Sequence, residues 1–231
     1  MMESTKFSNK LFNTSIFKMH VKRYWPFWVV LALLWIYIMP FLMFLSLGNA
    51  DGTNMLYRAK EQYCFAANNM PVLAMLTSIF VAMAVFNYIM NKERIQFMHS
   101  LPVTKAALFV TNYITGLIVM LSVYAFAGIL CILVCRFYGL GVMWGAFGLY
   151  MYSAVACTIF FYSFSVFVVM IAGQILAAPV YYFILNFAAP VLGFLISFLM
   201  YLFMFGYDNG WTFFEGLNWF SPIIKMSGSF A

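Results

Sequence analysis

Charged side chains are scarce in this chain. Of its 231 residues, 8% are charged and 66% are hydrophobic, whereas about 25% of the residues in an ordinary soluble domain are charged. A water-soluble fold of this length cannot hide so much apolar surface, so we expect lipid to surround most of the chain. The net charge of +6 does not indicate a nucleic-acid partner, because the cations lie in short segments beside apolar runs.

The sequence also lacks the motifs that several classes of enzyme need. It contains no Gly-Lys pair, which excludes a phosphate-binding P-loop. Its two histidines, His20 and His99, form no His-Glu-x-x-His motif, which excludes an intramembrane metalloprotease of that type. Asp208 resembles one half of an aspartyl-protease dyad, but the other aspartate, Asp51, falls in a predicted loop. We therefore expect no enzyme activity, no metal site and no cofactor in this chain.

The sequence contains four cysteines, and the positions of three of them indicate packing. Cys131, Cys135 and Cys157 lie inside apolar runs, where a disulfide framework is not expected. Cys131 and Cys135 have the spacing of one helix face, but no histidine or carboxylate stands near them to complete a zinc site. We expect these residues to pack as small apolar side chains.

In place of charge, the sequence has five long apolar runs. Each is long enough to cross a hydrocarbon core of roughly 30 Å as an α-helix. The runs predict an all-α polytopic membrane protein, a helical bundle of five spans within a transmembrane domain of residues 26–206. The spans are expected at about residues 27–47, 72–90, 106–135, 144–172 and 175–205.

Proline and polar residues mark the limits of the first two spans. Pro26 suits the first turn of span one, and Pro40 is expected to kink it. Residues 48–71 are polar and carry charge, so we expect a loop with at most one short helix before span two.

Glycine marks the limits of the later spans. After Arg136 the next charge is Asp208, and the uncharged stretch of about 70 residues between them suits two spans. We place the break between these spans at Gly173 and Gln174, the most polar point in the middle of that stretch. Gly139 and Gly141 are expected to make the turn between spans three and four, and Pro179 and Pro190 are expected to bend span five.

The two ends of the chain differ in character from the spans. Residues 1–25 combine apolar residues at helical spacing with basic residues, which predicts an amphipathic helix lying in the cytoplasmic membrane interface. The basic residues expected to face lipid headgroups are Lys10, Lys18, Lys22 and Arg23. Residues 207–231 are rich in aromatic side chains and are interpreted as an external segment rather than a sixth crossing.

The distribution of lysine and arginine predicts the orientation. The N-terminal segment and the connection between spans two and three together carry eight of these residues, and the other connections and the C-terminal tail carry four. The positive-inside rule therefore places the N-terminus and the connection of residues 91–105 in the cytoplasm. We expect a multi-pass protein of the plasma membrane.

Polar residues inside the spans are few, and none of the five spans contains Asp, Glu, Lys, Arg or His. The main candidates are Asn87, Asn112, Thr115 and Asn186. They are interpreted either as interhelical hydrogen-bond partners or as contacts of a translocation path, with the first reading favoured. Ion-coupled carriers usually place ionisable groups at mid-membrane, so we expect the energy source to lie outside this chain.

The connection between spans two and three carries the most specific motif. It reads ERIQFMHSLPVTK over residues 93–105 and runs directly into a long hydrophobic helix. This segment resembles the SLPVSR type of segment in bacterial ABC-2 type permeases, the membrane subunits of ATP-binding-cassette exporters. The order of elements along nearly the whole chain is also similar to that family.

The resemblance implies a partner, an energy source and a set of contact residues. In that family the connection forms a coupling helix that docks on an ABC ATPase subunit, and the residues it implies here are Glu93, Arg94, Phe97, Met98, His99 and Leu101. Two ATPase subunits, which carry ATP and Mg, would bind two permease chains that form a homodimer or a heterodimer in the lipid bilayer. The substrate would be hydrophobic or amphipathic, such as a peptide, an antibiotic or a lipid-like molecule. Because the family has six spans, a sixth is expected to follow residue 231.

Three alternatives remain open from the sequence. The connection can be a solvated turn that carries only positive-inside charge. The chain can be a membrane scaffold or sensor subunit that does not transport and that recruits a cytoplasmic partner through residues 91–105. The third alternative is a carrier that works alone, which would require ion-driven flux without ATP.

Overall fold

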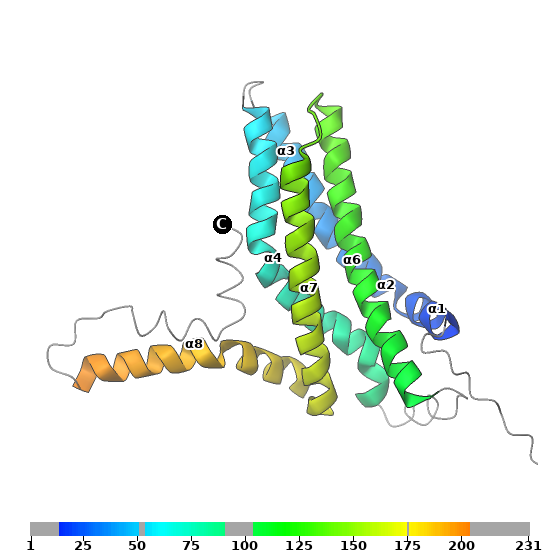
Figure 1. Ribbon diagram of the computed structural model, residues 1–231, viewed down its shortest axis with the longest axis vertical. Helices are drawn as coiled ribbons and strands as arrows, with labels where there is room; N and C mark the ends of the chain where they lie inside the picture. The colour runs from blue at the N-terminus through cyan, green and yellow to red at the C-terminus, as the bar shows by residue number, and fades with distance from the viewer. Residues whose placement is uncertain (1–13, 51–53, 91–103, 175, 204–231) are drawn as a thin grey trace, which may run out of the picture.

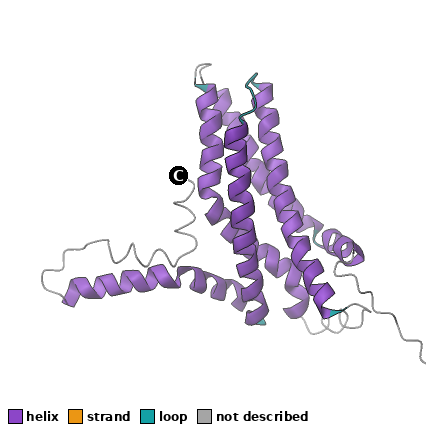
Figure 2. Cartoon of the chain, viewed as in Figure 1, coloured by secondary structure: helices purple, strands orange, loops and turns teal. Residues whose placement is uncertain are grey.

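The chain folds as an all-α polytopic helical bundle. The computed structural model describes residues 14–50, 54–90, 104–174 and 176–203, and within these ranges every regular element is a helix (Figure 2). The elements in chain order are α1 (Thr14–Arg23), α2 (Trp25–Ile36), η1 (Tyr37–Phe41), α3 (Leu42–Gly48), α4 (Met55–Phe86), η2 (Asn87–Met90), α6 (Lys105–Phe137), α7 (Trp144–Ala172) and α8 (Ala177–Phe203). This architecture confirms the predicted fold class.

Four of these helical segments are long and apolar enough to cross a membrane. They are Trp25–Gly48, which combines α2, η1 and α3, and the single helices α4, α6 and α7. The α8 segments Ala177–Ala188 and Pro190–Phe203 meet at an angle of 49° and provide a fifth if they count as one bent span. The lengths and composition of the helices therefore agree with a multi-pass membrane protein of up to five spans.

The first span is interrupted at Pro40. Residues Tyr37–Phe41 form a π-helical turn around this proline, between α2 and α3. Proline has no N–H to donate to the preceding turn, and a π turn is one way in which a helix absorbs that defect. Pro26 occupies the first turn of α2, as expected.

The second long helix begins earlier than the sequence indicated. We expected residues 48–71 to be mainly loop, but α4 starts at Met55 and continues through Pro71 to Phe86. The apolar stripe of its first half explains the difference, because Ala59, Tyr63 and Ala67 recur at helical spacing and are all buried. Charged residues on the opposite face of this half made the segment resemble a polar loop in the sequence.

The predicted turns after α6 and α7 are present. Gly139 has φ of 72° just after α6, and Gly173 has φ of 64° directly after the last residue of α7. Both values lie in the left-handed region, which glycine enters without a steric penalty. The helix α7 has the same bounds as the predicted fourth span, residues 144–172.

The centre of the bundle is the pair α4 and α7, with α6 beside them (Figure 1). Two glycines of α6 allow the close approach of α7. A Cβ at Gly116 would collide with the Tyr162 ring, and a Cβ at Gly128 would lie 3.0 Å from the Phe147 ring. Small residues at such contacts let two helix backbones approach closely in a membrane.

The last described helix, α8, runs away from the bundle (Figure 1). Its side chains Ala178, Tyr182 and Asn186 are buried at helical spacing, so its first half contributes one face to the bundle. Most of the large apolar side chains from Val191 to Phe203 are exposed. In a bilayer, lipid or another chain would cover this surface.

Candidate functional site

The ends of the connection between α4 and α6 lie together at one end of the bundle (Figure 1). The rings of Phe86, the last residue of α4, and Phe109, in the second turn of α6, have centroids 5.7 Å apart. Thr104 caps α6, because its Oγ1 accepts a hydrogen bond of 3.2 Å from the backbone N–H of Ala107. The two helix ends that carry the connection are therefore packed against each other.

The residues predicted to contact an ATPase subunit fall between these two ends. Residues 91–103 lie outside the described residues, and so do Glu93, Arg94, Phe97, Met98, His99 and Leu101. Their role stays a prediction. Asn87, in η2 just before this connection, is partly exposed.

The basic helix α1 packs beside α6 in the half that begins at Lys105 (Figure 1). The helix is two-sided. Ile16 and His20 are buried, whereas Lys18, Lys22 and Arg23 are exposed. This arrangement agrees with an amphipathic helix that turns its cations outward. Lys10, also expected on this helix, lies outside the described residues.

His20 differs from the other basic residues of α1 because it is buried. Its side chain is only 2% exposed, and both ring nitrogens lack a hydrogen-bond partner within the described part of the chain. Burial, with a smaller contribution from the Arg23 guanidinium, lowers the pKa of His20 from 6.5 to about 4. His20 lies within the basic segment of residues 1–25, but its ring is buried, whereas the neighbouring cations are exposed.

Hydrogen bonds between buried side chains join the helices of the bundle. Thr77 Oγ1 on α4 lies 2.9 Å from the Tyr124 hydroxyl on α6. The next residue, Ser78, lies 3.1 Å from the Tyr182 hydroxyl on α8, and its carbonyl accepts a bond of 3.2 Å from Ser165 on α7. Two adjacent residues of α4 thus connect three other helices.

Two of the predicted polar candidates bond within their own helices. Thr115 Oγ1 donates to the Thr111 carbonyl, and Asn186 Nδ2 donates to the Tyr182 carbonyl, both on the preceding turn. Such bonds satisfy a polar group locally and leave little for a ligand. Several of the interhelical bonds instead use tyrosine hydroxyls. Tyrosine does not stand out as a polar candidate in the sequence, because its ring also suits an apolar run.

Asn112 differs from these two residues. It is fully buried in α6, and neither its amide nitrogen nor its oxygen has a partner with hydrogen-bond geometry among the described residues. The Tyr88 hydroxyl is the polar group that interacts with it. A buried amide without full pairing is costly in an apolar medium, so Asn112 is the interior candidate that most invites a functional explanation.

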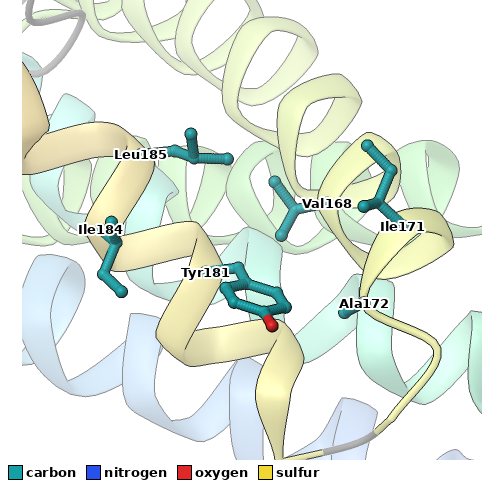
Figure 3. A pocket seen from close by; sticks show the side chains of 6 residues that line it. All are labelled: Val168, Ile171, Ala172, Tyr181, Ile184 and Leu185. Carbon is teal, nitrogen blue, oxygen red and sulfur yellow. The ribbon is translucent and has the colours of Figure 1, made fainter.

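Within the described part of the chain, shallow apolar cavities on the outside of the bundle include three of similar size. One, of about 370 Å³, lies between α7 and α8, with Val168, Ile171 and Ala172 facing Tyr181, Ile184 and Leu185 (Figure 3). Another, of about 400 Å³, lies between η1, α3 and α6, and the third, of about 560 Å³, lies on α7 around Phe160. Among the described residues, no group of three or more histidine, cysteine or acidic side chains is placed to hold a metal.

Comparisons with known proteins do not identify a family. No family model, no curated protein and no solved structure matches this chain. A functional proposal therefore depends on the residues of the chain, their arrangement and the short motif in the connection.

Proposed function

We propose that the chain is the permease subunit of an ATP-driven exporter that moves a hydrophobic or amphipathic substrate across the plasma membrane. A separate ABC ATPase subunit would bind the connection at residues 91–103 on the cytoplasmic side. ATP and Mg would bind that subunit, and a second permease chain would complete the pathway. The motif in the connection is the sequence feature that favours this family over other membrane proteins.

The packing at the two ends of the connection is the structural observation that carries the proposal. A force applied to residues 91–103 would act on α4 and α6 together, because Phe86 and Phe109 hold these two helix ends in contact. The hydrogen bonds of Thr77 and Ser78 join α4 to α6, α7 and α8. A cytoplasmic partner could therefore move the bundle by moving one connection.

The filled interior of the bundle favours a path shared between two chains. Tyr124, Tyr150, Tyr162 and Tyr182 are fully buried and occupy the space between the helices. A close-packed interior of this kind resists the passage of a bulky substrate. The apolar outer surfaces, including the cavity between α7 and α8 (Figure 3), are better suited to line a path between partners.

Co-purification and ATPase measurements test the proposal. The tagged full chain is isolated from its native host, and bound P-loop ATPases are identified and assayed. Replacing Arg94 and Phe97 together by alanine should reduce the bound ATPase at least tenfold and abolish its stimulation. Lys22→Ala removes an exposed cation from α1 and serves as the control. This variant should bind the ATPase normally. Unchanged binding and stimulation in the double variant would contradict the coupling role.

A membrane scaffold or sensor subunit is the second candidate. The close-packed interior favours this candidate in one respect, because a scaffold needs no translocation path through its interior. Vesicles that contain the chain and its ATPase distinguish the two. An exporter would move a fluorescent amphipathic probe only with hydrolysable ATP, whereas a scaffold would bind the ATPase without any flux.

A further inference from the structure

Two fully buried polar side chains at the contact between α6 and α7 lack hydrogen-bond partners. They are Asn112 on α6 and Tyr162 on α7. Among the residues that the structure places, neither amide atom of Asn112 has a partner with hydrogen-bond geometry, and the Tyr162 hydroxyl has none either. Buried polar groups in native proteins are nearly always paired, so two such groups on neighbouring helices require an explanation.

Gly116 shows how close these two groups lie. A Cβ at Gly116 would collide with the Tyr162 hydroxyl oxygen, so this hydroxyl occupies the space that a side chain at position 116 would take. Asn112 precedes Gly116 by four residues, and side chains at this spacing are neighbours on one helix face, with Cβ atoms about 5–6 Å apart. The Tyr162 hydroxyl therefore lies about one helical turn from Asn112, on the same face of α6.

A third polar group reaches Asn112 from the end of α4. The Tyr88 side chain on η2 is buried, and its hydroxyl interacts with Asn112. An amide both donates and accepts, and so does a phenol, so Asn112 can pair with a tyrosine from either side. Because η2 directly precedes residues 91–103, Tyr88 links Asn112 to the connection.

A different interhelical bond holds α7 in its described position along α6. The Tyr113 hydroxyl lies 2.7 Å from Ser163 Oγ, and the Tyr113 and Tyr162 rings have centroids 5.4 Å apart. Sliding α7 by less than one turn toward the start of α6 would break this bond and bring the Tyr162 hydroxyl to Asn112. One interhelical bond would replace another, and packed helices are known to change position by shifts of this size.

We propose that Asn112 and Tyr162 form a switch between two positions of α7 along α6. In the described position, Tyr113 bonds to Ser163 and the Tyr162 hydroxyl has no partner. In the second position, the Tyr162 hydroxyl donates to the Asn112 amide oxygen. Gly116 permits the change, because it has no side chain in the path of the hydroxyl. The proposal is independent of the exporter function, since it concerns motion within a single chain.

Fluorine NMR of the purified full chain in nanodiscs tests the proposal. The probe is 4-fluorophenylalanine at position 161, next to Tyr162 in the buried part of α7. Its fluorine lies on the ring axis, so rotation of the ring gives no second signal. We expect two resonances in slow exchange, with the weaker one, from the second position, holding at least 5% of the intensity.

Variants of the two bonds should change the weaker resonance in opposite directions. Asn112→Leu should lower its intensity at least fivefold. Tyr162→Phe removes a single oxygen and should do the same, which keeps the test valid if Asn112→Leu does not fold. Ser163→Ala removes the bond of the described position and should raise the intensity at least twofold. Thr115→Val is the control and should change it by less than 1.5-fold, because Thr115 bonds to the Thr111 carbonyl on its own helix.

Two results would overturn the proposal. The first is a single resonance in the native chain, which is also the result expected if a bound water pairs Asn112 with Tyr162 in one fixed position. The second is a weaker resonance whose intensity stays the same in Tyr162→Phe and in Ser163→Ala.

Discussion

The side-chain amide of Gln62 on α4 donates a hydrogen bond of 3.2 Å to the backbone carbonyl of Ile38, inside the π turn of the first span. Sequence reasoning assigned Gln62 to a loop, yet it supplies a polar partner where the helical hydrogen-bond pattern is irregular. This hydrogen bond connects α4 to the backbone of the turn that contains Pro40, so Gln62 stabilises the packing of the interrupted span against α4.

We expect Gln62→Leu to destabilise the chain by about 1 kcal/mol, because a hydrogen bond of this kind contributes about that much. Unfolding by SDS titration in mixed micelles measures the change. Gln62→Glu is a second test that keeps the size of the side chain. It should lower stability more than Gln62→Leu does, because a carboxylate cannot donate a hydrogen bond to the carbonyl and places a charge beside it. Equal stability of all three proteins would contradict the role of this bond.

Gly116 is expected to tolerate no side chain. A Cβ there would collide with the Tyr162 ring, and overpacking of this kind costs about 1–3 kcal/mol. Gly116→Ala should therefore lower stability in the same SDS titration. Gly148 is the control, because a Cβ at this position would meet nothing within 4 Å. The double variant Gly116→Ala with Tyr162→Leu should recover part of the loss, and a neutral Gly116→Ala would contradict the close helix contact.

The hydrogen bond between Thr77 and Tyr124 should couple α4 to α6. A double-mutant cycle with Thr77→Val and Tyr124→Phe is expected to give a coupling free energy of about 0.6 kcal/mol, the average for such bonds in membrane proteins. A second cycle with Thr77→Val and Ser153→Ala serves as the control. Ser153 bonds to the Tyr150 carbonyl on its own helix, so its coupling to Thr77 should be near zero.

Docking of α1 on α6 should weaken in acid because of His20. Well above pH 6.5 the ring is neutral whether α1 is docked or free. As the pH falls from 6.5 toward about 4, the free ring takes up a proton that the buried ring does not, since burial lowers the pKa of His20. Each pH unit in this window costs about 1.4 kcal/mol of docking free energy.

Hydrogen exchange of residues 14–23, corrected for intrinsic rates, measures this effect. Exchange in the native protein should rise between pH 6.5 and 4.5. His20→Phe keeps an aromatic ring and removes the titrating group, so its protection should not depend on pH. A native profile as flat as that of the phenylalanine variant would show that His20 is not buried against α6.

The sequence predicted the features that follow from length, composition and backbone conformation. The bounds of α7 and the turns at Gly139 and Gly173 were predicted because uncharged runs and glycine have direct structural consequences. The early start of α4 was missed because Ala59 and Tyr63 are separated by polar residues in a segment of mixed composition. Periodicity of small residues is a weaker signal than charge.

The candidate site was less accessible to sequence reasoning. Asn112 was named from its polarity, and it is fully buried as expected of an interior polar residue. The Thr77 and Ser78 contacts join segments 47 and 104 residues apart, and nothing in local spacing indicates which tyrosine each would meet. The residues predicted to contact an ATPase subunit were named from a motif, and because they lie outside the described residues that role stays a prediction.

The π turn at Tyr37–Phe41 also determines how α3 is rotated about the helix axis relative to α2. A π turn amounts to one residue inserted into an α-helix. Removing that residue would rotate everything after it by about 100°, since one residue is 1/3.6 of a turn. Met43 and Leu47, both fully buried, would then swing outward toward lipid. The extra residue therefore keeps the buried faces of α2 and α3 directed toward the same neighbouring helices.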